Sequence, residues 1–339
     1  MALPDAAYLQ FTPDLRICRL LTGMWQVSGA HGRIDPAAAV AAMVAYHDAG
    51  YTTWDLADHY GPAEDLIGAF RRRLAGSRGA TALGQVQAFT KWVPAPGRIT
   101  RRMVEDAVAR SCRRMGADTL DLLQFHWWEY DDPGYLDALD ALAHLQRAGT
   151  IRHLALTNFD TDHLRLLVER GLPIVSNQVQ YSLIDRRPEV HLAAYCRRHG
   201  ISLLAYGTLG GGLLSERYVG QPEPAPASLN TASLQKYKQM VDAWGGWERF
   251  QHLLAVLEPI AKRHRVSIAN VAVRYVLDRP AVAGVIVGAR LGVADHLADT
   301  TRVFGLRLDA ADLEAIENGL ADARDLYRLI GDCGDEYRR

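Results

Sequence analysis

Short apolar runs alternate with longer amphipathic segments along most of the chain. The short runs are rich in β-branched and aromatic residues and predict strands, whereas the longer segments carry apolar residues at helical spacing. The predicted strands are residues 20–25, 52–57, 86–91, 120–126, 153–158, 174–180, 202–206 and 284–288. The predicted helices are residues 36–49, 63–74, 101–115, 134–148, 161–170, 189–199, 247–263 with 268–277, and 293–303.

Strands that alternate with helices pair in parallel through right-handed crossovers. A closed eight-stranded barrel and an open doubly wound sheet both satisfy this pattern. The near-regular spacing of the eight predicted strands favours the barrel, and so does the missing GxGxxG motif after the first strand. We therefore predict an α/β fold, a (β/α)8 TIM barrel that forms a single domain over residues 1–339.

Two segments depart from this alternation. Residues 210–246 carry Pro222, Pro224 and Pro226 near their middle, and we predict a long irregular loop after the seventh strand. In a barrel such a loop lies over the C-terminal mouth, where it could cover a substrate or cofactor. The tail from residue 323 onward, predicted to be helical, could close over the same mouth or pack beneath the barrel.

The composition excludes several classes of protein. Hydrophobic residues make up 49% and charged residues 23%, and the net charge of −1 provides no field to attract nucleic acid or an anionic membrane. The N-terminus lacks a signal-peptide pattern and no apolar run is long enough to span a bilayer, so we expect a cytoplasmic protein. The widely spaced cysteines fit neither a zinc site nor a disulfide framework, and they are Cys18, Cys112, Cys196 and Cys333.

Polar residues end three consecutive predicted strands. Asp55 ends the second strand, with Tyr60 in the following loop, while Lys91 and His126 end the third and fourth strands. Each residue alone is more often a cap, a solvated charge or a structural histidine. Because the carboxyl ends of barrel strands meet at one mouth, we expect the four side chains to converge there.

These four residue types suit proton transfer to a carbonyl oxygen. A tyrosine is a poor acid at neutral pH, but a nearby lysine ammonium lowers its pKa and a carboxylate keeps that lysine charged. His126 can donate a hydrogen bond that orients the carbonyl. No serine or cysteine completes a nucleophilic triad, and one histidine, one aspartate and a lysine make a poor metal site.

The sequence resembles the aldo-keto reductase family from about residue 20 to residue 316. Residues 50–61, GYTTWDLADHYG, look like the family signature, residues 90–91 match its lysine motif, and residues 121–126, DLLQFH, match its histidine motif. The resemblance implies a catalytic tetrad formed by Asp55, Tyr60, Lys91 and His126.

The resemblance also implies a nicotinamide cofactor. Asn158 and Gln178 match the amides that hold the carboxamide, and Tyr206 matches the ring that stacks on the nicotinamide. Arg290 at the start of the last barrel helix suits a ribose 2′-phosphate, which favours NADPH (NADP+) over NADH. The implied cofactor-binding residues are Gly23, Met24, Trp25, Asp55, Thr157, Asn158, Gln178, Tyr206, Gly207, Leu209, Gly288, Ala289, Arg290, His296, Asp299 and Thr300.

We therefore expect NADPH-dependent reduction of a small aldehyde or ketone, or the reverse oxidation, with Tyr60 as the proton donor. Three alternatives stay open at this point. They are a Schiff-base lyase that uses Lys91, an NADP-sensing binding protein and a redox-neutral enzyme that regenerates its cofactor. The candidate walls of the substrate pocket are Trp25, Trp92, Trp127 and Trp128.

Overall fold

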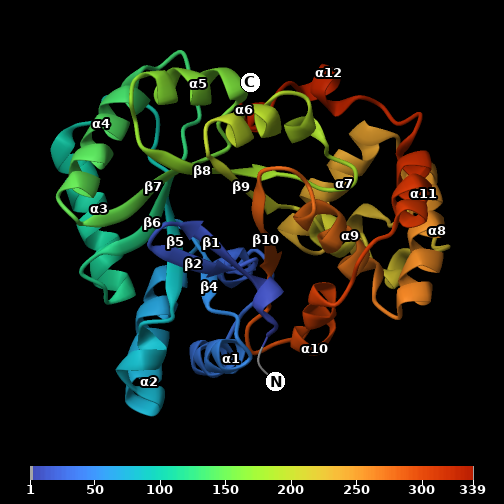
Figure 1. The fold of residues 1–339 in the computed structure, drawn as a ribbon, viewed down its shortest axis with the longest axis horizontal. Helices are drawn as coiled ribbons and strands as arrows, with labels where there is room; N and C mark the ends of the chain where they lie inside the picture. Colours follow the sequence, from blue (N-terminus) through green and yellow to red (C-terminus); the bar gives the residue numbers. More distant parts are fainter. Residues whose placement is uncertain (1–2, 339) are drawn as a thin grey trace.

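The computed structural model describes residues 3–338 and confirms the predicted barrel. Eight parallel strands close in the order β10-β3-β4-β5-β6-β7-β8-β9, and helices surround them (Figure 1). Every predicted strand is present, with small shifts at the ends. The barrel strands are β3 (Leu20–Gly23), β4 (Thr53–Asp55), β5 (Gln87–Trp92), β6 (Leu120–Phe125), β7 (Ile151–Thr157), β8 (Ile174–Gln180), β9 (Ser202–Tyr206) and β10 (Val282–Gly288).

Two of the predicted helices differ in extent, and helices also form over Ala232–Trp244 and Ala310–Leu320, where none was predicted. The second helix continues past residue 74 to Leu83 and has a kink at Gly79, whose backbone is not helical. The segment at 293–303 holds only a short helix and a 3-10 turn. The helices are α1 (Pro36–Asp48), α2 (Ala63–Leu83), α3 (Arg101–Met115), α4 (Gly134–Arg147), α5 (Thr161–Glu169), α6 (Leu192–Arg198), α7 (Ala232–Trp244), α8 (Trp247–His264), α9 (Ile268–Leu277), α10 (Leu297–Thr300), α11 (Ala310–Leu320) and α12 (Leu326–Ile330).

A β-hairpin that the sequence pattern did not predict covers the N-terminal end of the barrel. Strands β1 (Tyr8–Thr12) and β2 (Leu15–Cys18) pair antiparallel. The buried side chains of β2 pack against inward-facing barrel residues, among them Phe89 and Leu122. The hairpin therefore excludes water from that end of the barrel interior.

The prediction of an irregular loop at residues 210–246 is wrong in its second half, where α7 forms. Thr231 caps this helix by accepting a hydrogen bond from the backbone N–H of Leu234 at 3.2 Å. Leu234 and Tyr237, three residues apart, are buried on one face of α7. The three prolines lie before the helix and do not interrupt it.

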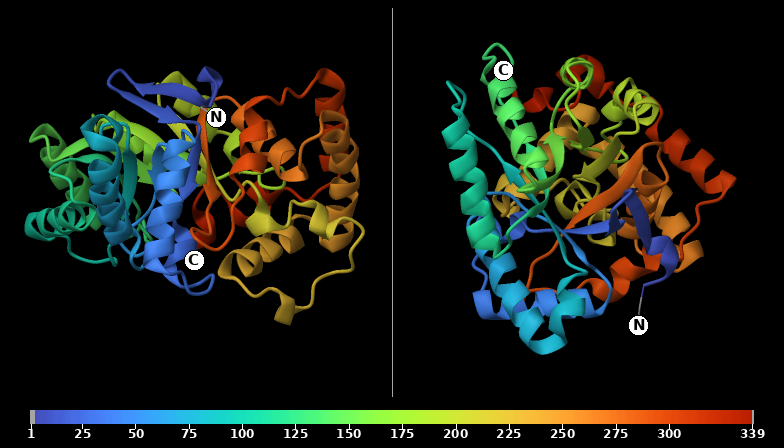
Figure 2. Two further views of the ribbon diagram at one scale, coloured as in Figure 1. Left: turned by 90° about the horizontal axis from the view of Figure 1, so that it is seen from below. Right: turned by 60° about the vertical axis from the view of Figure 1, so that its left-hand side comes forward.

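The C-terminal ends of the barrel strands lie at the end opposite the hairpin. The left view of Figure 2 places the blue hairpin at one end and the yellow-to-gold segment that contains α7 at the other. The register between strands pairs Gly23 with Asp55 and Lys91 with Gln124. Side chains from neighbouring strand ends therefore stand at similar heights around the mouth.

The four cysteines all carry free thiols. Burial raises the pKa of the Cys18 thiol to about 12, so this side chain packs as a small uncharged group. Between residues 3 and 338, no helix combines the length and the apolar character needed to cross a bilayer.

Candidate active site

A cavity of about 780 Å³ lies at the mouth of the barrel. Its wall is formed by strand ends, by the segment from β9 to α7 and by the end of the C-terminal tail. The four expected catalytic residues, Asp55, Tyr60, Lys91 and His126, all line this wall. The structure thus brings together side chains from three strands and one loop.

Asp55 lies at the centre of a buried hydrogen-bond network. Its Oδ2 accepts from Lys91 Nζ at 2.7 Å, and its Oδ1 accepts from Gln124 Nε2 at 3.0 Å and from Gln178 Nε2 at 2.6 Å. Asp55 and Lys91 are each 3% exposed. A carboxylate buried this deeply is stabilised only when its oxygens are paired, and here both are.

The Lys91 ammonium is held beside the Tyr60 ring. Besides Asp55, it donates to the carbonyl oxygen of Leu56 at 3.0 Å, and it lies 5.2 Å from the centre of the Tyr60 ring. Burial lowers the pKa of Lys91, and the ion pair with Asp55 acts in the opposite direction.

Lys91 was expected to lower the pKa of Tyr60, but in this state of the site other groups outweigh any such effect. Burial, followed by the Asp55 carboxylate, raises the pKa of Tyr60 well above its usual value. The Tyr60 hydroxyl therefore keeps its proton at neutral pH.

His126 is neutral and is placed as an acceptor. Its Nδ1 lies 3.2 Å from the carbonyl oxygen of Thr157, and because a carbonyl only accepts, Nδ1 carries the proton. Burial lowers the pKa of His126 to about 4. His126 was expected to donate to the substrate oxygen, but the Nε2 of this tautomer carries a lone pair and accepts instead.

Most of the expected cofactor residues line the cavity, and two do not. Met24 and Ala289 are buried in the core, where their backbone N–H groups donate to the carbonyl oxygens of Asp55 at 2.8 Å and Gly23 at 3.0 Å. These two positions tie neighbouring strand ends together. The residues on the wall are Gly23, Trp25, Asp55, Thr157, Asn158, Gln178, Tyr206, Gly207, Leu209, Gly288, Arg290, His296, Asp299 and Thr300.

Polar groups in this cavity suit an amide-bearing cofactor. The amide N–H groups of Gln178 donate to Asp55 Oδ1 and, at 2.7 Å, to Gln124 Oε1. The carbonyl oxygen of Gln178 is therefore left to accept from a carboxamide. Among residues 3–338, the buried Thr22 Oγ1 and Gln26 Oε1 have no hydrogen-bond partner, and both residues line the cavity. Buried polar atoms of this kind favour a polar ligand that satisfies them.

The far end of the cavity carries Arg290, His296, Asp299 and Thr300. Arg290 is exposed and forms no ion pair with any carboxylate between residues 3 and 338. Asp299 is already engaged, because its Oδ2 accepts from Ser267 Oγ at 2.7 Å. This end therefore offers an uncompensated guanidinium to a phosphate.

Only two of the four expected tryptophans line the cavity, Trp25 and Trp128. The prediction for Trp92 and Trp127 is wrong. Both pack against Phe125 in the core, and the Trp127 indole N–H donates to backbone carbonyls. They directly follow the inward-facing Lys91 and His126, and successive residues at a strand end point to opposite faces.

The C-terminal tail closes over the mouth, which settles the alternative left open by the sequence. Tyr337 lines the cavity, and its ring centre lies 5.8 Å from that of His126 and 6.1 Å from that of Trp128. Its hydroxyl lies 3.1 Å from the hydroxyl of Tyr206, which donates to Asn158 Oδ1 at 2.8 Å. The tail thus contacts residues expected to bind both cofactor and substrate.

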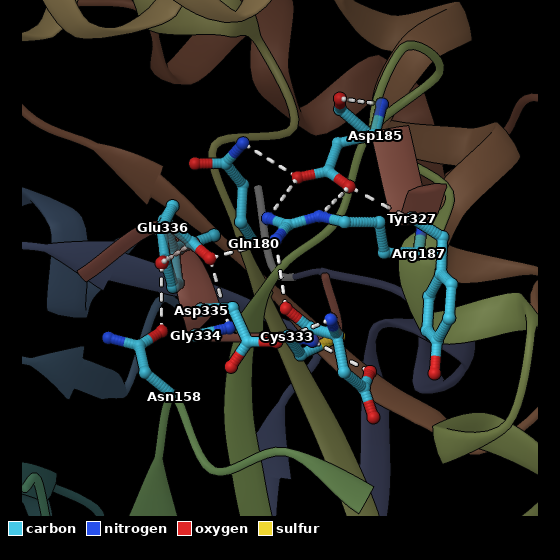
Figure 3. Close-up of polar contacts among 12 residues, drawn as sticks. Asn158, Gln180, Asp185, Arg187, Tyr327, Cys333, Gly334, Asp335 and Glu336 are labelled. Atoms are coloured by element: carbon cyan, nitrogen blue, oxygen red, sulfur yellow. Dashed lines mark hydrogen bonds and ion pairs between the residues drawn. The ribbon is translucent and has the colours of Figure 1, made fainter. Parts of the chain in front are cut away.

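A buried ion-pair cluster anchors the tail (Figure 3). Arg187 donates from Nε and Nη2 to the two carboxylate oxygens of Asp185, at 2.9 and 2.8 Å. Its Nη1 donates to Glu336 Oε2 at 2.9 Å and to the carbonyl oxygen of Asp332 at 3.0 Å. One guanidinium therefore joins the loop after β8 to two residues of the tail.

Several residues of the site were not predicted from the sequence, among them Gln124, Lys236 and Tyr337. Gln124 lies in the DLLQFH motif, and its place two residues before an inward-facing histidine puts it on the same face of the barrel wall. Lys236 was missed because its segment was predicted to be irregular. Tyr337 had no local signal, because long-range contacts decide where the tail lies.

Comparison with known proteins identifies this arrangement. The model of the Aldo/keto reductase family matches residues 19–320. The chain belongs to the aldo-keto reductase family. As an aldo-keto reductase it is a nicotinamide-dependent oxidoreductase of carbonyl and alcohol groups, which confirms the family resemblance and the enzyme class.

The named relatives of this aldo-keto reductase include a flagellar protein and a reductase. The flagellar radial spoke protein 5 of Chlamydomonas reinhardtii is 32% identical over 257 residues, or 63% of this chain and 47% of that protein, so the match spans about half of that relative. The NADH-specific methylglyoxal reductase of Escherichia coli (strain K12) is 24% identical over 328 residues, or 89% and 94% of the two chains. A solved thermostable aldo-keto reductase in complex with the inhibitor epalrestat has the same fold, with a TM-score of 0.68, 24% identity and coverage of 92% and 99%.

Proposed function

We propose that this aldo-keto reductase reduces an aldehyde or ketone with NADPH and that Tyr60 donates the proton. The bound nicotinamide supplies a hydride to the carbonyl carbon, and the oxygen takes the Tyr60 proton, so that an alcohol and NADP+ form. The observation that carries this proposal is the convergence of Tyr60, His126 and the Asp55–Lys91 ion pair on one cavity wall.

The state of Tyr60 supports the role of a general acid. An acid must hold its proton until the reacting oxygen becomes basic, and burial of Tyr60 raises its pKa and keeps it protonated. The Lys91 ammonium beside the ring stabilises the phenolate once the proton has left. The reverse oxidation needs a deprotonated Tyr60, and burial of Tyr60 opposes that state at neutral pH.

His126 and two tryptophans are proposed to position the substrate. Nε2 of the neutral His126 accepts a hydrogen bond from the hydroxyl of the alcohol product. Trp25 and Trp128 offer apolar surface to the carbon skeleton. We also propose that residues 1–339 act as one cytoplasmic domain on a small-molecule carbonyl substrate.

Arg290 supports NADPH over NADH as the cofactor. The Arg290→Ala variant is expected to lose about tenfold or more of its NADPH affinity, because a guanidinium binds a phosphate through charge-assisted hydrogen bonds. NADH lacks the 2′-phosphate and is expected to bind both proteins with similar affinity. Fluorescence titration with each cofactor measures the two dissociation constants.

Arg302→Ala is the matched control for this prediction. It removes the same charge from a guanidinium whose hydrogen bond goes to the Arg265 carbonyl, and we expect no change in either affinity. Equal weakening of NADPH and NADH in Arg290→Ala would exclude the 2′-phosphate role.

The proposed function is tested by mixing the NADPH-bound enzyme with a panel of aldehydes and ketones. Carbonyl-dependent loss of the absorbance of reduced nicotinamide is expected. Tight NADPH binding without turnover of any carbonyl would instead favour an NADP-sensing protein or a redox-neutral enzyme. Covalent trapping of a carbonyl on Lys91 by borohydride, with no NADPH binding, would favour the Schiff-base lyase.

A further inference from the structure

Lys236 in the first half of α7 places an ammonium group in the cavity wall. Its Nζ lies 4.9 Å from the centre of the Tyr206 ring, 5.4 Å from that of Tyr237 and 4.7 Å from that of Tyr337. Three aromatic rings therefore contact one half-buried cation.

Lys236 has no carboxylate in ion-pair contact in the part of the chain that the structure describes. Within residues 3–338, no carboxylate oxygen lies within 4.0 Å of its Nζ, and it donates a hydrogen bond to the Tyr337 hydroxyl. By contrast, Lys238 on the same helix pairs with both Glu223 and Asp242. Burial acts to lower the pKa of Lys236, but Tyr337, Tyr237 and Glu336 outweigh it, so the pKa is raised and the group stays charged.

The ammonium stands close to the proposed reaction centre. The Tyr337 ring that it contacts lies 5.8 Å from the His126 ring, in a perpendicular orientation. The Tyr337 ring therefore lies between Lys236 and His126, and both of these residues line the same cavity as Tyr60. A small molecule with a carbonyl at Tyr60 can place a second group near Lys236.

We propose that Lys236 binds an anionic group of the substrate, so that the enzyme prefers carbonyl compounds that carry a carboxylate or phosphate. This proposal rests on the proposed reductase function. An ammonium has three donors, and Tyr337 takes one of them, which leaves two for the oxygens of an anion. The positive charge of Lys236, which has no carboxylate of residues 3–338 in direct contact, attracts such an anion.

The test compares matched acids and neutral analogues in the intact enzyme. The first pair is 4-carboxybenzaldehyde and its methyl ester, and the second is glyceraldehyde 3-phosphate and glyceraldehyde. The wild type is expected to have a higher kcat/KM for the acid of at least one pair. In Lys236→Met the ratio of kcat/KM for that acid to its neutral partner is expected to fall about 10- to 100-fold, as for loss of a hydrogen bond to a charged group.

Two further variants sharpen the test. Lys236→Arg keeps the positive charge and is expected to retain most of the preference for the acid. Lys262→Met removes a lysine charge from the exposed surface of α8 and is expected to change neither ratio. The pair that responds, carboxylate or phosphate, identifies the anion.

Three outcomes would overturn the proposal. The first is a Lys236→Met enzyme whose ratio of kcat/KM for acid and neutral partner is unchanged, and the second is a wild type that prefers neither acid. The third is a loss of NADPH affinity in Lys236→Met that accounts for the whole effect, because Lys236 would then bind the cofactor phosphates. If the wild type reduces neither the acids nor their neutral partners, the panel of aldehydes and ketones tests the proposed function separately, and calorimetry then decides the anion site. Binding of 4-carboxybenzaldehyde or glyceraldehyde 3-phosphate to the wild type and its loss in Lys236→Met supports the site, and equal binding to both excludes it.

Discussion

Tyr60→Phe is expected to lower kcat by about 10²- to 10⁴-fold, the range that a general acid contributes. The substitution removes the proton proposed for the alkoxide and keeps the ring that contacts Lys91 and His59. Because the wall of the cavity keeps its shape, NADPH affinity is expected to change little. Single-turnover oxidation of bound NADPH measures the chemical step, and fluorescence titration measures the affinity.

Tyr195→Phe provides the control for removal of a tyrosine hydroxyl. Tyr195 is buried on α6 and lies outside the cavity wall, so the kcat of the Tyr195→Phe enzyme is expected to match that of the wild type. A Tyr60→Phe enzyme with unchanged kcat would remove Tyr60 from the mechanism. A large loss of NADPH affinity would show that the hydroxyl acts mainly in cofactor binding.

Arg187→Ala is expected to lower the free energy of unfolding by about 3–5 kcal/mol, the usual result of removing one partner from a buried ion pair. Arg187 is 2% exposed, and its loss leaves the carboxylates of Asp185 and Glu336 without their shared cation (Figure 3). Urea denaturation measures the difference from the wild type. A loss below about 1 kcal/mol would show that water replaces the guanidinium at little cost.

The neighbouring residue supplies a matched control. Arg186 pairs with Glu189 and Glu317, but its side chain is 36% exposed, so Arg186→Ala is expected to cost about 1 kcal/mol or less. The two variants remove the same charge from neighbouring positions, so they differ mainly in how deeply the side chain is buried.

The effect of Arg187→Ala should shrink on acidification. Burial acts to raise the pKa of Glu336, but the charge and hydrogen bond of Arg187 together with the charge of Lys236 outweigh it, so the folded-state pKa lies below the usual value. A carboxylate with a depressed pKa contributes stability above its unfolded-state pKa, and that contribution is lost as the pH falls through the folded-state pKa. Unfolding measured below the ordinary glutamate pKa should therefore give a smaller difference between the two proteins.

The barrel and the positions of Asp55, Tyr60, Lys91 and His126 were predictable because their signals are local. Alternation of apolar runs with amphipathic segments predicts parallel strands and crossover helices, and the closed barrel confirms this. Closure alone brings the carboxyl ends of the strands to one mouth, so polar residues at those ends had to meet.

The errors have physical causes of two kinds. Trp92 and Trp127 were assigned to the pocket although strand alternation, a local rule, turns each away from its inward-facing neighbour. The hairpin and α7 were missed because both are stabilised by burial against the barrel, through residues such as Ile17 and Leu234. Burial of this kind depends on partners that are distant in the sequence.

The sequence by itself determined the barrel, the family resemblance and the four residues of the proposed proton-transfer site, because each depends on the periodicity and order of nearby residues. Only the tertiary structure decided that the tail closes the mouth, that Tyr60 is held protonated and that Lys236 faces the cavity. Contacts such as that between Arg187 and Glu336 join residues 149 positions apart. The burial that raises the pKa of Tyr60 likewise exists only after distant segments have packed around it.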